Sequence, residues 1–589
     1  MNFIISETLK AFKNLFQVDL DPQLISLQET RKEFEGQVTI VVFPLTKYSK
    51  LGPEQTAQVL GEFLKENLSE VAAFNVVKGF LNLRLSDNYW KDTLNALLTN
   101  PEALTIPSNG KKILVEYSSP NTNKPLHLGH VRNNLLGYAV SELLKAVGYE
   151  VIKVNLVNDR GIHICKSMLA WQKWGNGETP ESSGLKGDHL VGKYYVIFDK
   201  HYKEEINALM ATGMPEETAK KSAPLIVEAQ QMLQQWEAGD AEIIALWEKM
   251  NGWVYEGFNI TYKRLGVDFD KYYYESQTYL LGKDTIQEGL DKGVFFKKED
   301  GSVWIDLTPD GLDQKLVLRA DGTSVYITQD LGTAEMKHDD FQMEESIYVV
   351  GNEQDYHFKV LFLILEKLGK TWAKGLHHLS YGMVDLPSGK MKSREGTVVD
   401  ADDLINEMVD TAKQQTEALG KIDAFSEQER EQLYNLIGMG ALKYFLLKVE
   451  PKKRLLFNPA ESIDFQGHTG PFIQYTHARI KSLLAKTNHV LNPVKPAEDL
   501  LDTELEMIRL MGTYTDVLKS AAQAFSPAIM ANYLFELAKL FNKFYHEIPP
   551  LIKEENEQVK QNRLNLCVLT AQILKNGMGL LGIQVPERM

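Results

Sequence analysis

The chain has 589 residues, of which 44% are apolar and 24% charged, and a formal net charge of −15. Such a length exceeds what one hydrophobic core organises, so about three to five domains are expected. A purely electrostatic binder of nucleic acid is usually basic, so any RNA partner must be bound through local Lys/Arg patches. Two distant cysteines, Cys165 and Cys567, argue against a disulfide framework or a cysteine-rich zinc site and fit a reducing cytosol. No apolar run approaches the roughly 18 residues of a membrane span.

The first 108 residues have the pattern of a compact α/β domain. An amphipathic segment over residues 1–16 predicts a helix, because it lacks the basic start, long apolar core and cleavage site of a signal peptide. The apolar runs QVTIVVFPL and NVVKGFLNLRL predict strands, and residues 54–68 predict a helix. Prolines and a Ser-Asn-Gly cluster near residue 108 mark the end of this domain.

Strand and helix patterns alternate from residue 112 onwards, which predicts an α/β fold with a doubly wound parallel sheet. Residues 161–255 are charged and helical in character, so they are expected to form an insertion between sheet elements. Asp-Gly pairs between later runs predict hairpin turns. The later runs expected as strands are KVNLVND, SVWIDL, KLVLR, SVYIT, SIYVVGN and LHHLSYGMVDL, with a helix over about 354–368.

Only helical patterns follow from about residue 403 to the end. A helix capped by Asp400 or Asp402 opens this part, and its last portion mixes basic and aromatic residues, as in YTHARIKSLLAK. These changes of pattern predict domains over residues 1–108, 109–402, 403–469 and 470–589, with the insertion at about 161–255 inside the second.

The motif HLGH opens a predicted helix that follows a predicted strand. His127 and His130 share one face of the helix start, and Gly129 leaves room for a flat base against the backbone. Free N–H groups and the helix dipole suit such an end to a phosphate. Paired imidazoles can also hydrogen-bond a phosphoryl group as its charge builds. The alternative is a pair of surface or capping histidines.

The loop before HLGH favours the functional interpretation, because it adds Asn121, Asn123 and Lys124 to the same turn. A zinc site is not expected there, since no third His or Cys lies nearby. A second basic loop, GKMKSREG, follows a late strand. Its Lys390, Lys392 and Arg394 could close over a triphosphate, although such a loop by itself is more often a solvated surface segment.

These two motifs, in this order, resemble those of the class I aminoacyl-tRNA synthetases. The segments EYSSPNTNKPLHLGHVRNN, VYITQDLGTAE, GNEQDYHF, GPFIQYTHARI and the terminal PERM together resemble arginyl-tRNA synthetases over essentially the whole chain. The resemblance implies that ATP activates L-arginine to arginyl-adenylate and that tRNA(Arg) receives the arginine on its 3′-terminal adenosine, with release of AMP and pyrophosphate. It also implies that bound tRNA is needed for activation.

One departure from the class pattern concerns the second basic loop. It reads KMKSR, with Ser393 where the second lysine of KMSKS normally stands. In the family that it resembles, a lysine just before HxGH is thought to substitute, which makes Lys124 a catalytic candidate. The catalytic residues implied are Lys124, His127, His130, Lys390, Lys392 and Arg394, and the ATP contacts implied are His127, Gly129, His130, Lys390 and Met391.

The amino-acid pocket can be argued from the chemistry of arginine, whose planar cation favours carboxylates and aromatic surfaces. Glu116 ends a predicted strand, and Tyr326 and Asp330 span a predicted strand-to-helix junction, where ligands of open α/β folds bind. Helix caps or surface charges are the alternative for both acids, and His357 is a weaker candidate. The resemblance assigns the arginine contacts to Glu116, Ser119, Asn121, Tyr326, Asp330 and Gln354.

The two ends of the chain resemble tRNA-binding modules. GFLNLRL resembles the strand with which this family reads the D-loop, so Phe80 is expected to stack on an unpaired base and Asn82 to read its edge. An ordinary sheet strand is the alternative. The C-terminal helices resemble an anticodon-binding domain.

The expected partners are tRNA(Arg), L-arginine and ATP, with Mg²⁺ accompanying ATP and without zinc. A cytoplasmic monomer without a membrane partner is expected. A cysteinyl synthetase would share HxGH but would need a zinc site that two cysteines hardly permit. A small-molecule nucleotidyltransferase has no need of the long helical C-terminus, and a non-catalytic RNA-binding paralogue would lose the histidines or pocket acids.

Overall fold

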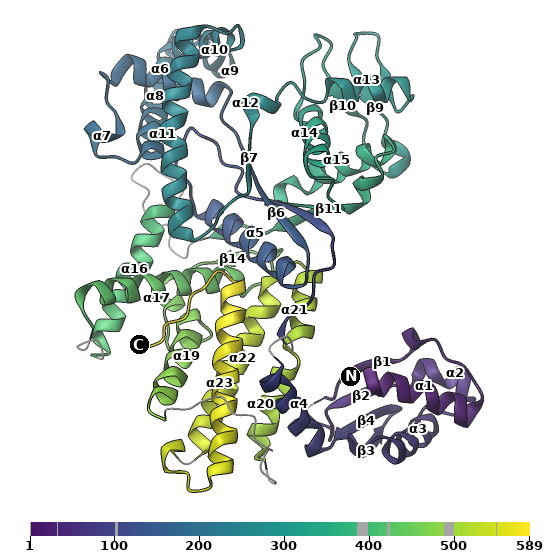
Figure 1. Ribbon diagram of the computed structural model, residues 1–589. Coiled ribbons are helices and arrows are strands. Elements are labelled where there is room, and N and C mark those ends of the chain that lie inside the picture. Colours follow the sequence, from purple (N-terminus) through teal and green to yellow (C-terminus); the bar gives the residue numbers. More distant parts are fainter. Residues whose placement is uncertain are drawn as a thin grey trace. The chain divides into compact units, whose positions relative to one another are not determined.

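The computed structural model describes residues 2–31, 33–100, 104–385, 399–420, 425–487, 500–548 and 550–589 (Figure 1). The chain forms two compact units. One unit contains Met1–Leu104, Leu483–Tyr514 and Lys539–Ala571, and the other contains the remaining segments. None of the helices in the described ranges is long and apolar enough to cross a membrane.

The unit with the N-terminus is built on an antiparallel sheet in the order β1-β2-β4-β3 (Figure 1). NVVKGFLNLRL contributes parts of two strands rather than one, because Lys78 and Gly79 adopt positive φ values of 48° and 79° and turn the chain into a hairpin. Its elements are α1 (Asn2–Phe16), β1 (Ser26–Glu29), β2 (Val38–Val41), α2 (Thr46–Ser49), α3 (Pro53–Asn67), β3 (Val71–Val77), β4 (Phe80–Leu85) and α4 (Asp87–Thr99).

The other unit contains the parallel sheet that the alternating pattern predicts. All its neighbouring strands pair in parallel, in the order β12-β11-β5-β6-β7. Strands β6 and β7 extend the sheet on one side of β5, whereas β11 and β12 extend it on the other. The direction of winding therefore reverses between β5 and β11. Ligands of open α/β sheets bind at the carboxyl ends of the strands beside such a reversal. The strands are β5 (Lys112–Glu116), β6 (Glu150–Val157), β7 (Lys271–Tyr274), β11 (Glu345–Gly351) and β12 (Leu376–Tyr381).

Helix α5 (Leu128–Ala146) connects β5 to β6 and is buried along most of its length. The predicted helical insertion is confirmed between β6 and β7, where the chain forms only helices. They are α6 (Ile162–Trp174), α7 (Pro180–Ser183), α8 (Gly187–Ala211), α9 (Glu216–Ser222), α10 (Pro224–Glu237) and α11 (Ala241–Leu265).

A small antiparallel sheet, in the order β10-β9-β8, lies between β7 and β11 in the sequence. The strand prediction for SVYIT is wrong, because α14 begins at Tyr326. Thr328 accepts a hydrogen bond from the Val325 N–H and donates one to the Val317 carbonyl, so this cap overrides the β-branched propensity. The elements are α12 (Glu275–Thr278), α13 (Lys283–Asp291), β8 (Phe295–Lys297), β9 (Val303–Ile305), β10 (Lys315–Leu318), α14 (Tyr326–Phe341) and α15 (Asp355–Lys367).

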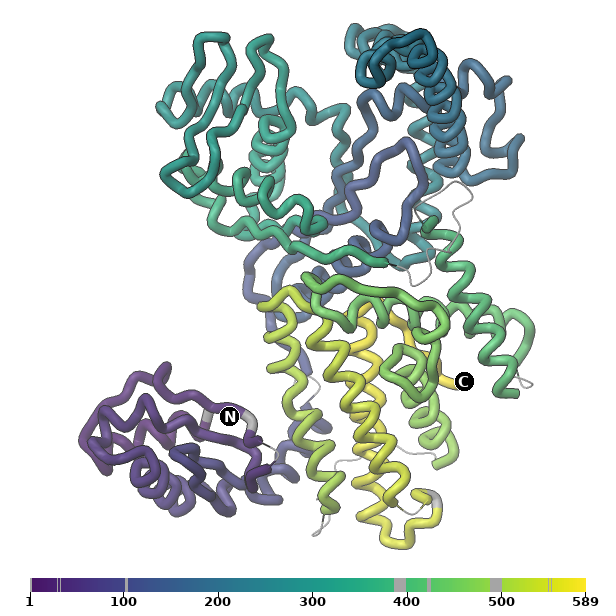
Figure 2. The backbone as a smooth tube through the Cα atoms, turned by 180° about the vertical axis from the view of Figure 1, so that it is seen from behind, coloured from purple at the N-terminus to yellow at the C-terminus, as the bar shows by residue number. Residues whose placement is uncertain are grey.

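Helices dominate the rest of the chain, but the expectation of helices alone after residue 403 is wrong at the two-residue strand β14, which pairs with β13. Asp400 caps α16 by accepting hydrogen bonds from the Asp402 and Asp403 N–H groups, at 2.8 and 3.2 Å, which confirms one of the two predicted caps. Helices α22 and α23 run side by side (Figure 1, Figure 2). The elements are β13 (Val384–Asp385), α16 (Ala401–Ala418), α17 (Glu427–Leu447), β14 (Leu455–Leu456), α18 (Pro459–Ser462), α19 (Gly470–Ala485), α20 (Asp502–Gly512), α21 (Tyr514–Gln523), α22 (Pro527–Glu547) and α23 (Glu557–Leu580).

The close packing of α5 on the chain that follows β5 depends on Gly137. A Cβ atom at this position would lie 2.3 Å from Cγ of Tyr117, whose side chain is fully buried. The Tyr117 hydroxyl donates to the Asp268 carbonyl at 2.6 Å, so the ring is held from its other end and cannot readily move. Gly137 therefore sets the distance between α5 and the start of the loop that precedes HLGH.

We expect Gly137→Ala to destabilise the protein by about 1–3 kcal/mol, because overpacking outweighs the gain in helix propensity. The control is Gly252→Ala in α11, where, apart from its chain neighbours and the backbone of its own helix turn, no atom lies within 4 Å of the new methyl group. That variant should unfold at the same temperature as the wild type or slightly higher. Thermal unfolding of the two full-length variants measures the difference, and equal midpoints would contradict this account of Gly137.

Candidate active site

Four of the six predicted arginine contacts lie at or follow the carboxyl ends of strands in the parallel sheet. Glu116 is the last residue of β5, and Ser119 and Asn121 follow in the loop before HLGH. Gln354 is exposed at the N-cap of α15, directly after β11. Asp330 lies on α14, in its second turn, rather than at a strand end. The sixth predicted arginine contact, Tyr326 at the start of α14, has 80% of its side chain exposed.

The loop after β5 is held in an unusual backbone conformation. Ser118 and Ser119 have φ values of 78° and 45°, which non-glycine residues rarely adopt. The Ser118 N–H donates to Oδ1 of Asn133 at 2.6 Å, and the Ser119 N–H donates to Oδ1 of Asn155 at 3.1 Å. Strain of this kind persists where the surroundings fix it and is typical of functional sites. Both asparagines escaped the sequence prediction, although Asn133 belongs to the HVRNN segment.

The HLGH residues form a reciprocal cap at the N-terminus of α5. Nδ1 of His127 accepts a hydrogen bond from the Gly129 N–H at 3.1 Å, and Nδ1 of His130 accepts one from the His127 N–H at 3.2 Å. An imidazole nitrogen that accepts carries no proton, so a neutral ring must carry it on Nε2. Both histidines therefore present an Nε2–H donor, with their ring centroids 3.9 Å apart.

The surroundings of the two imidazoles keep them neutral. Burial, reinforced by the positive charge of Lys124, lowers the pKa of His127 to about 4. Burial also lowers the pKa of His130 well below its usual value, and His127 and Lys124 act in the same direction. Lys124 consequently lies close enough to both rings to influence them. The three predicted groups on this side of the sheet are thus one lysine cation and two neutral donors.

The chain returns to HLGH at residues 399–401. The Leu128 N–H donates to the Val399 carbonyl and the Ala401 N–H donates to the Leu126 carbonyl, each at 2.9 Å. The predicted phosphate-binding residues Lys390, Met391, Lys392 and Arg394 lie outside the described residues. The backbone that follows them is hydrogen-bonded to the histidine motif itself.

Arg132 of α5 also binds the backbone that precedes the predicted phosphate-binding residues. This guanidinium is only 2% exposed and donates to the carbonyls of Gly382 and Met383, at 2.8 and 3.3 Å. Its other nitrogen donates to the carbonyls of Pro451 and Lys453, at 3.1 and 2.9 Å. A buried arginine that bonds four carbonyls fixes the backbone by hydrogen bonds without a partner carboxylate.

Two acidic groups of the predicted arginine pocket come near each other around Lys337. The buried Glu116 carboxylate forms an ion pair with the ammonium of Lys337, which is itself 2% exposed. Oδ2 of Asp330 and Nε2 of His357 lie 2.6 Å apart and share a hydrogen bond. The charge of Asp330 also acts on Lys337. Lys337 was not predicted from the sequence. It lies one turn before the end of α14, and no local sequence pattern distinguishes it from a surface lysine.

Two further acids lie beyond the strand ends and were also missed. Asp159, after β6, accepts hydrogen bonds from the Ser276 N–H at 2.8 Å, from its hydroxyl at 2.7 Å and from the Tyr255 hydroxyl at 3.0 Å. Glu275 follows β7; burial raises its pKa, and the negative charges of Asp159 and Asp330 raise it further against the opposing effect of Arg160. Their position after parallel strands was the available signal.

Within the described part of the chain, one group of side chains is spaced closely enough to hold a metal ion. It consists of His189, Asp400 and Asp402. Nε2 of His189 lies 3.3 and 3.4 Å from the two carboxylates. The Lys186 ammonium pairs with the same Asp402 carboxylate. A neighbouring lysine cation that already neutralises a ligand argues against a divalent ion at this position.

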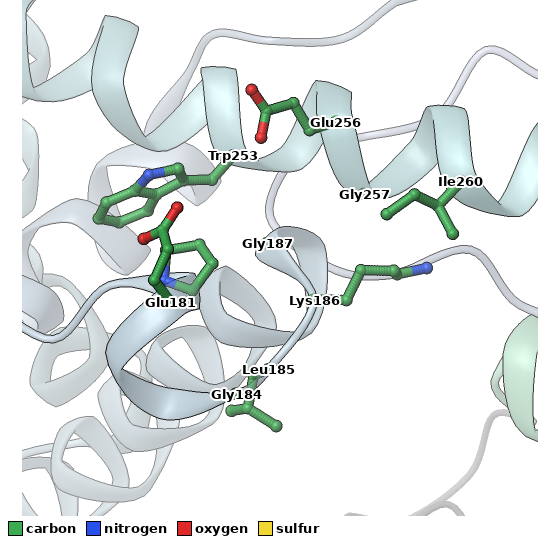
Figure 3. A pocket seen from close by; sticks show the side chains of 10 residues that line it. Glu181, Gly184, Leu185, Lys186, Gly187, Trp253, Glu256, Gly257 and Ile260 are labelled. Atoms are coloured by element: carbon green, nitrogen blue, oxygen red, sulfur yellow. The ribbon is translucent and has the colours of Figure 1, made fainter.

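Two cavities lie away from the sheet edge. One, of about 540 Å³, lies in the helical insertion among Trp253, Leu185 and Ile260, and none of the predicted ATP or arginine contacts that the structure describes lines it (Figure 3). The other, of about 270 Å³, lies in the N-terminal sheet and is lined by Phe80 and Asn82. The Asn82 amide is 1% exposed; it accepts from Thr39 and donates to Asn75.

The neutral state of His127 can be tested by an NMR pH titration of isotope-labelled histidine, with His127→Asn to assign its signal. The ring of His127 should stay unprotonated down to about pH 5, because its pKa is lowered to about 4. An inflection at about pH 6.5 would contradict the burial argument. Since the unfolded chain binds this proton at higher pH than the folded chain, stability should fall as pH drops through about 6.5 to 4.

Comparison with known proteins agrees with this geometry. Residues 93–458 match the model of the tRNA synthetases class I (R) catalytic domain, and residues 473–589 match the DALR anticodon binding domain. The chain is 58% identical to the arginine–tRNA ligase of Amoebophilus asiaticus, over 100% of both chains. It is 56% identical to that of Bacteroides thetaiotaomicron, over 100% of this chain and 99% of the relative.

The fold of the chain is also similar to that of a solved arginyl-tRNA synthetase. The structure of Thermus thermophilus arginyl-tRNA synthetase superposes with a TM-score of 0.81 at 24% identity and covers 100% of both chains. Family models account for the catalytic and C-terminal parts, and relatives of high identity span the full length. The resemblance noted from the motifs is therefore confirmed, and the chain belongs to the class I arginyl-tRNA synthetases, the family of arginine–tRNA ligases.

Proposed function

We propose that this protein is an arginine–tRNA ligase whose ATP site is formed by Lys124, His127 and His130 and whose arginine site is formed around Glu116 and Asp330. The observation that carries the proposal is the pair of neutral imidazoles at the N-terminus of α5, each with its Nε2–H free of the capping bonds. They lie beside a lysine cation and at the same sheet edge as an acidic pocket.

The reaction needs positioning and charge stabilisation rather than a side-chain nucleophile. The arginine carboxylate attacks the α-phosphate of ATP in line and pyrophosphate leaves, which gives arginyl-adenylate. The ribose hydroxyl of the terminal adenosine of tRNA(Arg) then attacks the mixed anhydride, and AMP leaves. Each step moves negative charge onto or off a phosphate, so fixed donors on the protein lower its barrier.

Lys124, His127 and His130 supply such donors to ATP. The imidazoles donate from Nε2 and remain neutral, so they do not lose their donor protons as phosphate charge builds. Lys124 contributes the positive charge that the second lysine of KMSKS would supply in other class I enzymes. We include Gly129 as an ATP contact, and Lys390, Met391, Lys392 and Arg394 on the strength of the sequence. Mg²⁺ enters with the triphosphate.

Arginine binds with its guanidinium toward the carboxylates. Glu116 and Asp330 provide the negative charge, since a planar cation with several donors can bond two carboxylates at once. Ser119 and Asn121, in the strained loop after β5, lie on the path from this pocket to HLGH and are assigned to the substrate's backbone end. Gln354 and the exposed Tyr326 complete the contacts that we propose for the bound amino acid.

The cavity of the N-terminal sheet is our candidate for an unpaired base of the tRNA. Phe80 offers a ring for stacking, while Arg31 and Lys78 in the same lining supply positive charge for a phosphate. Asn82 forms its floor and would read the base edge with the hydrogen-bonding capacity that Thr39 and Asn75 leave unused. We further propose that the enzyme acts as a monomer in the cytosol, in keeping with its two buried free thiols.

ATP–pyrophosphate exchange with each amino acid, with and without tRNA(Arg), tests the activity. Exchange should require arginine and tRNA together; exchange with cysteine or glutamate instead would overturn the substrate, and exchange without tRNA would overturn only the tRNA dependence. His130→Ala should lose about 100-fold or more in rate, since a donor to the phosphate is lost. It should still bind tRNA, and His201→Ala, which removes a half-buried histidine of α8 in the helical insertion, is the control.

Phe80→Ala should raise KM for tRNA in aminoacylation about tenfold, because stacking on one base is lost. The kcat at saturating tRNA should stay within about twofold, since the ring touches neither ATP nor arginine. Phe296→Ala, which removes an exposed phenylalanine from β8, is the control. An unchanged KM for tRNA would remove this cavity from the tRNA site.

A further inference from the structure

Lys337 is a buried cation to which the proposed mechanism gives no role. Its ammonium pairs with Oε2 of Glu116, and both side chains are almost wholly buried, at 2% and 6% exposure. The ammonium also lies 4.9 Å from the ring centroid of Tyr348 and 6.0 Å from that of Tyr273. The pair therefore joins α14 to the end of β5 inside the sheet edge where arginine is proposed to bind.

Burial of such a pair needs an explanation, because apolar residues of similar volume usually stabilise a core at least as well. Glu116 and Asp330 together carry two negative charges, whereas the arginine side chain brings one positive charge. Lys337 lies seven residues after Asp330 on the same helix, which places both on one face of α14. Its ammonium offsets one of the two negative charges of Glu116 and Asp330, so these three groups together carry −1, which a single guanidinium neutralises.

We propose that Lys337 is a specificity-determining positioning residue of the arginine pocket, which holds the Glu116 carboxylate in place and commits its Oε2 so that Oε1 is left for the guanidinium. The inference rests on the proposed function, since it assigns a role within the same amino-acid site. A guanidinium spreads its donors over a plane and can bond Oε1 of Glu116 and Asp330 together. The ammonium of a substrate lysine concentrates its donors at one atom, so the arrangement favours arginine.

The groups around the pair agree with this role. Burial alone would disfavour the Lys337 ammonium, but the charge of Glu116, with Tyr348 and Asp330, outweighs it and raises the pKa of Lys337. Burial raises the pKa of the Tyr348 and Tyr273 phenols, so both rings are neutral at neutral pH. Within the described residues, Lys337 is accordingly the cation that forms an ion pair with Glu116.

The test compares Lys337→Met, which removes the charge at similar length, with Lys337→Arg, which retains it. The matched control is Lys271→Met. It breaks a partly exposed ion pair between Nζ of Lys271, in β7, and Oδ2 of Asp340, which lie 2.5 Å apart. Asp340 belongs to α14, the helix that carries Lys337. Steady-state aminoacylation gives KM for arginine, KM for ATP and kcat. Competition with lysine gives the specificity directly.

Lys337→Met should raise KM for arginine by about 10- to 100-fold, with kcat within about threefold and KM for ATP unchanged. Lys337→Arg and Lys271→Met should keep the wild-type KM for arginine. Discrimination against lysine should weaken only in Lys337→Met.

A wild-type KM for arginine in Lys337→Met, or a loss confined to kcat or thermal stability, would overturn the proposal. If Lys337→Met does not fold, Lys337→Arg decides: a retained KM supports the role of the charge, and a rise above about tenfold overturns it. Failure of the proposed function would look different. In that case neither the wild type nor Lys271→Met would attach arginine to tRNA.

Discussion

The hydrogen bonds that cap the N-terminus of α5 are the interaction on which the site depends. Two backbone N–H groups donate to the Nδ1 atoms of His127 and His130 and thereby fix where each ring carries its proton. Burial and the charge of Lys124 keep both rings neutral. A helix end that would otherwise need only a cap becomes a pair of oriented donors, because the capping groups are imidazoles with a second nitrogen.

The same helix organises segments that are distant in the sequence. Arg132 binds carbonyls at Gly382 and Met383, and Leu128 binds the Val399 carbonyl, so the backbone on each side of the predicted phosphate loop is fixed to α5. Asn133 holds the strained Ser118 and donates to the Val349 carbonyl of β11. One helix therefore aligns the ends of β5 and β11, where the sheet reverses its winding.

Charge is distributed unequally along this edge, in keeping with the two proposed substrates. The side of Lys124 and the histidines combines one cation with neutral donors, which suits a triphosphate. The side of Glu116 and Asp330 carries an excess of negative charge that Lys337 reduces to one unit, which suits a guanidinium. Both sides meet in a short loop after β5, so one strand–loop–helix unit contacts ATP and arginine without a long connection between the two sites.

The sequence by itself determined the strand–HLGH–helix unit, the helical insertion, α15 and the Asp400 cap, because these depend on local periodicity and capping. It did not determine that α14 begins at Tyr326, within SVYIT, since the Thr328 hydroxyl donates a hydrogen bond to the carbonyl of Val317, which lies outside this segment. The partners of the site, Asn133 with Ser118, Asn155 with Ser119 and Lys337 with Glu116, were decided only by the tertiary structure. Their hydrogen bonds and ion pairs join residues far apart in the chain, and no local pattern records which elements the fold brings together.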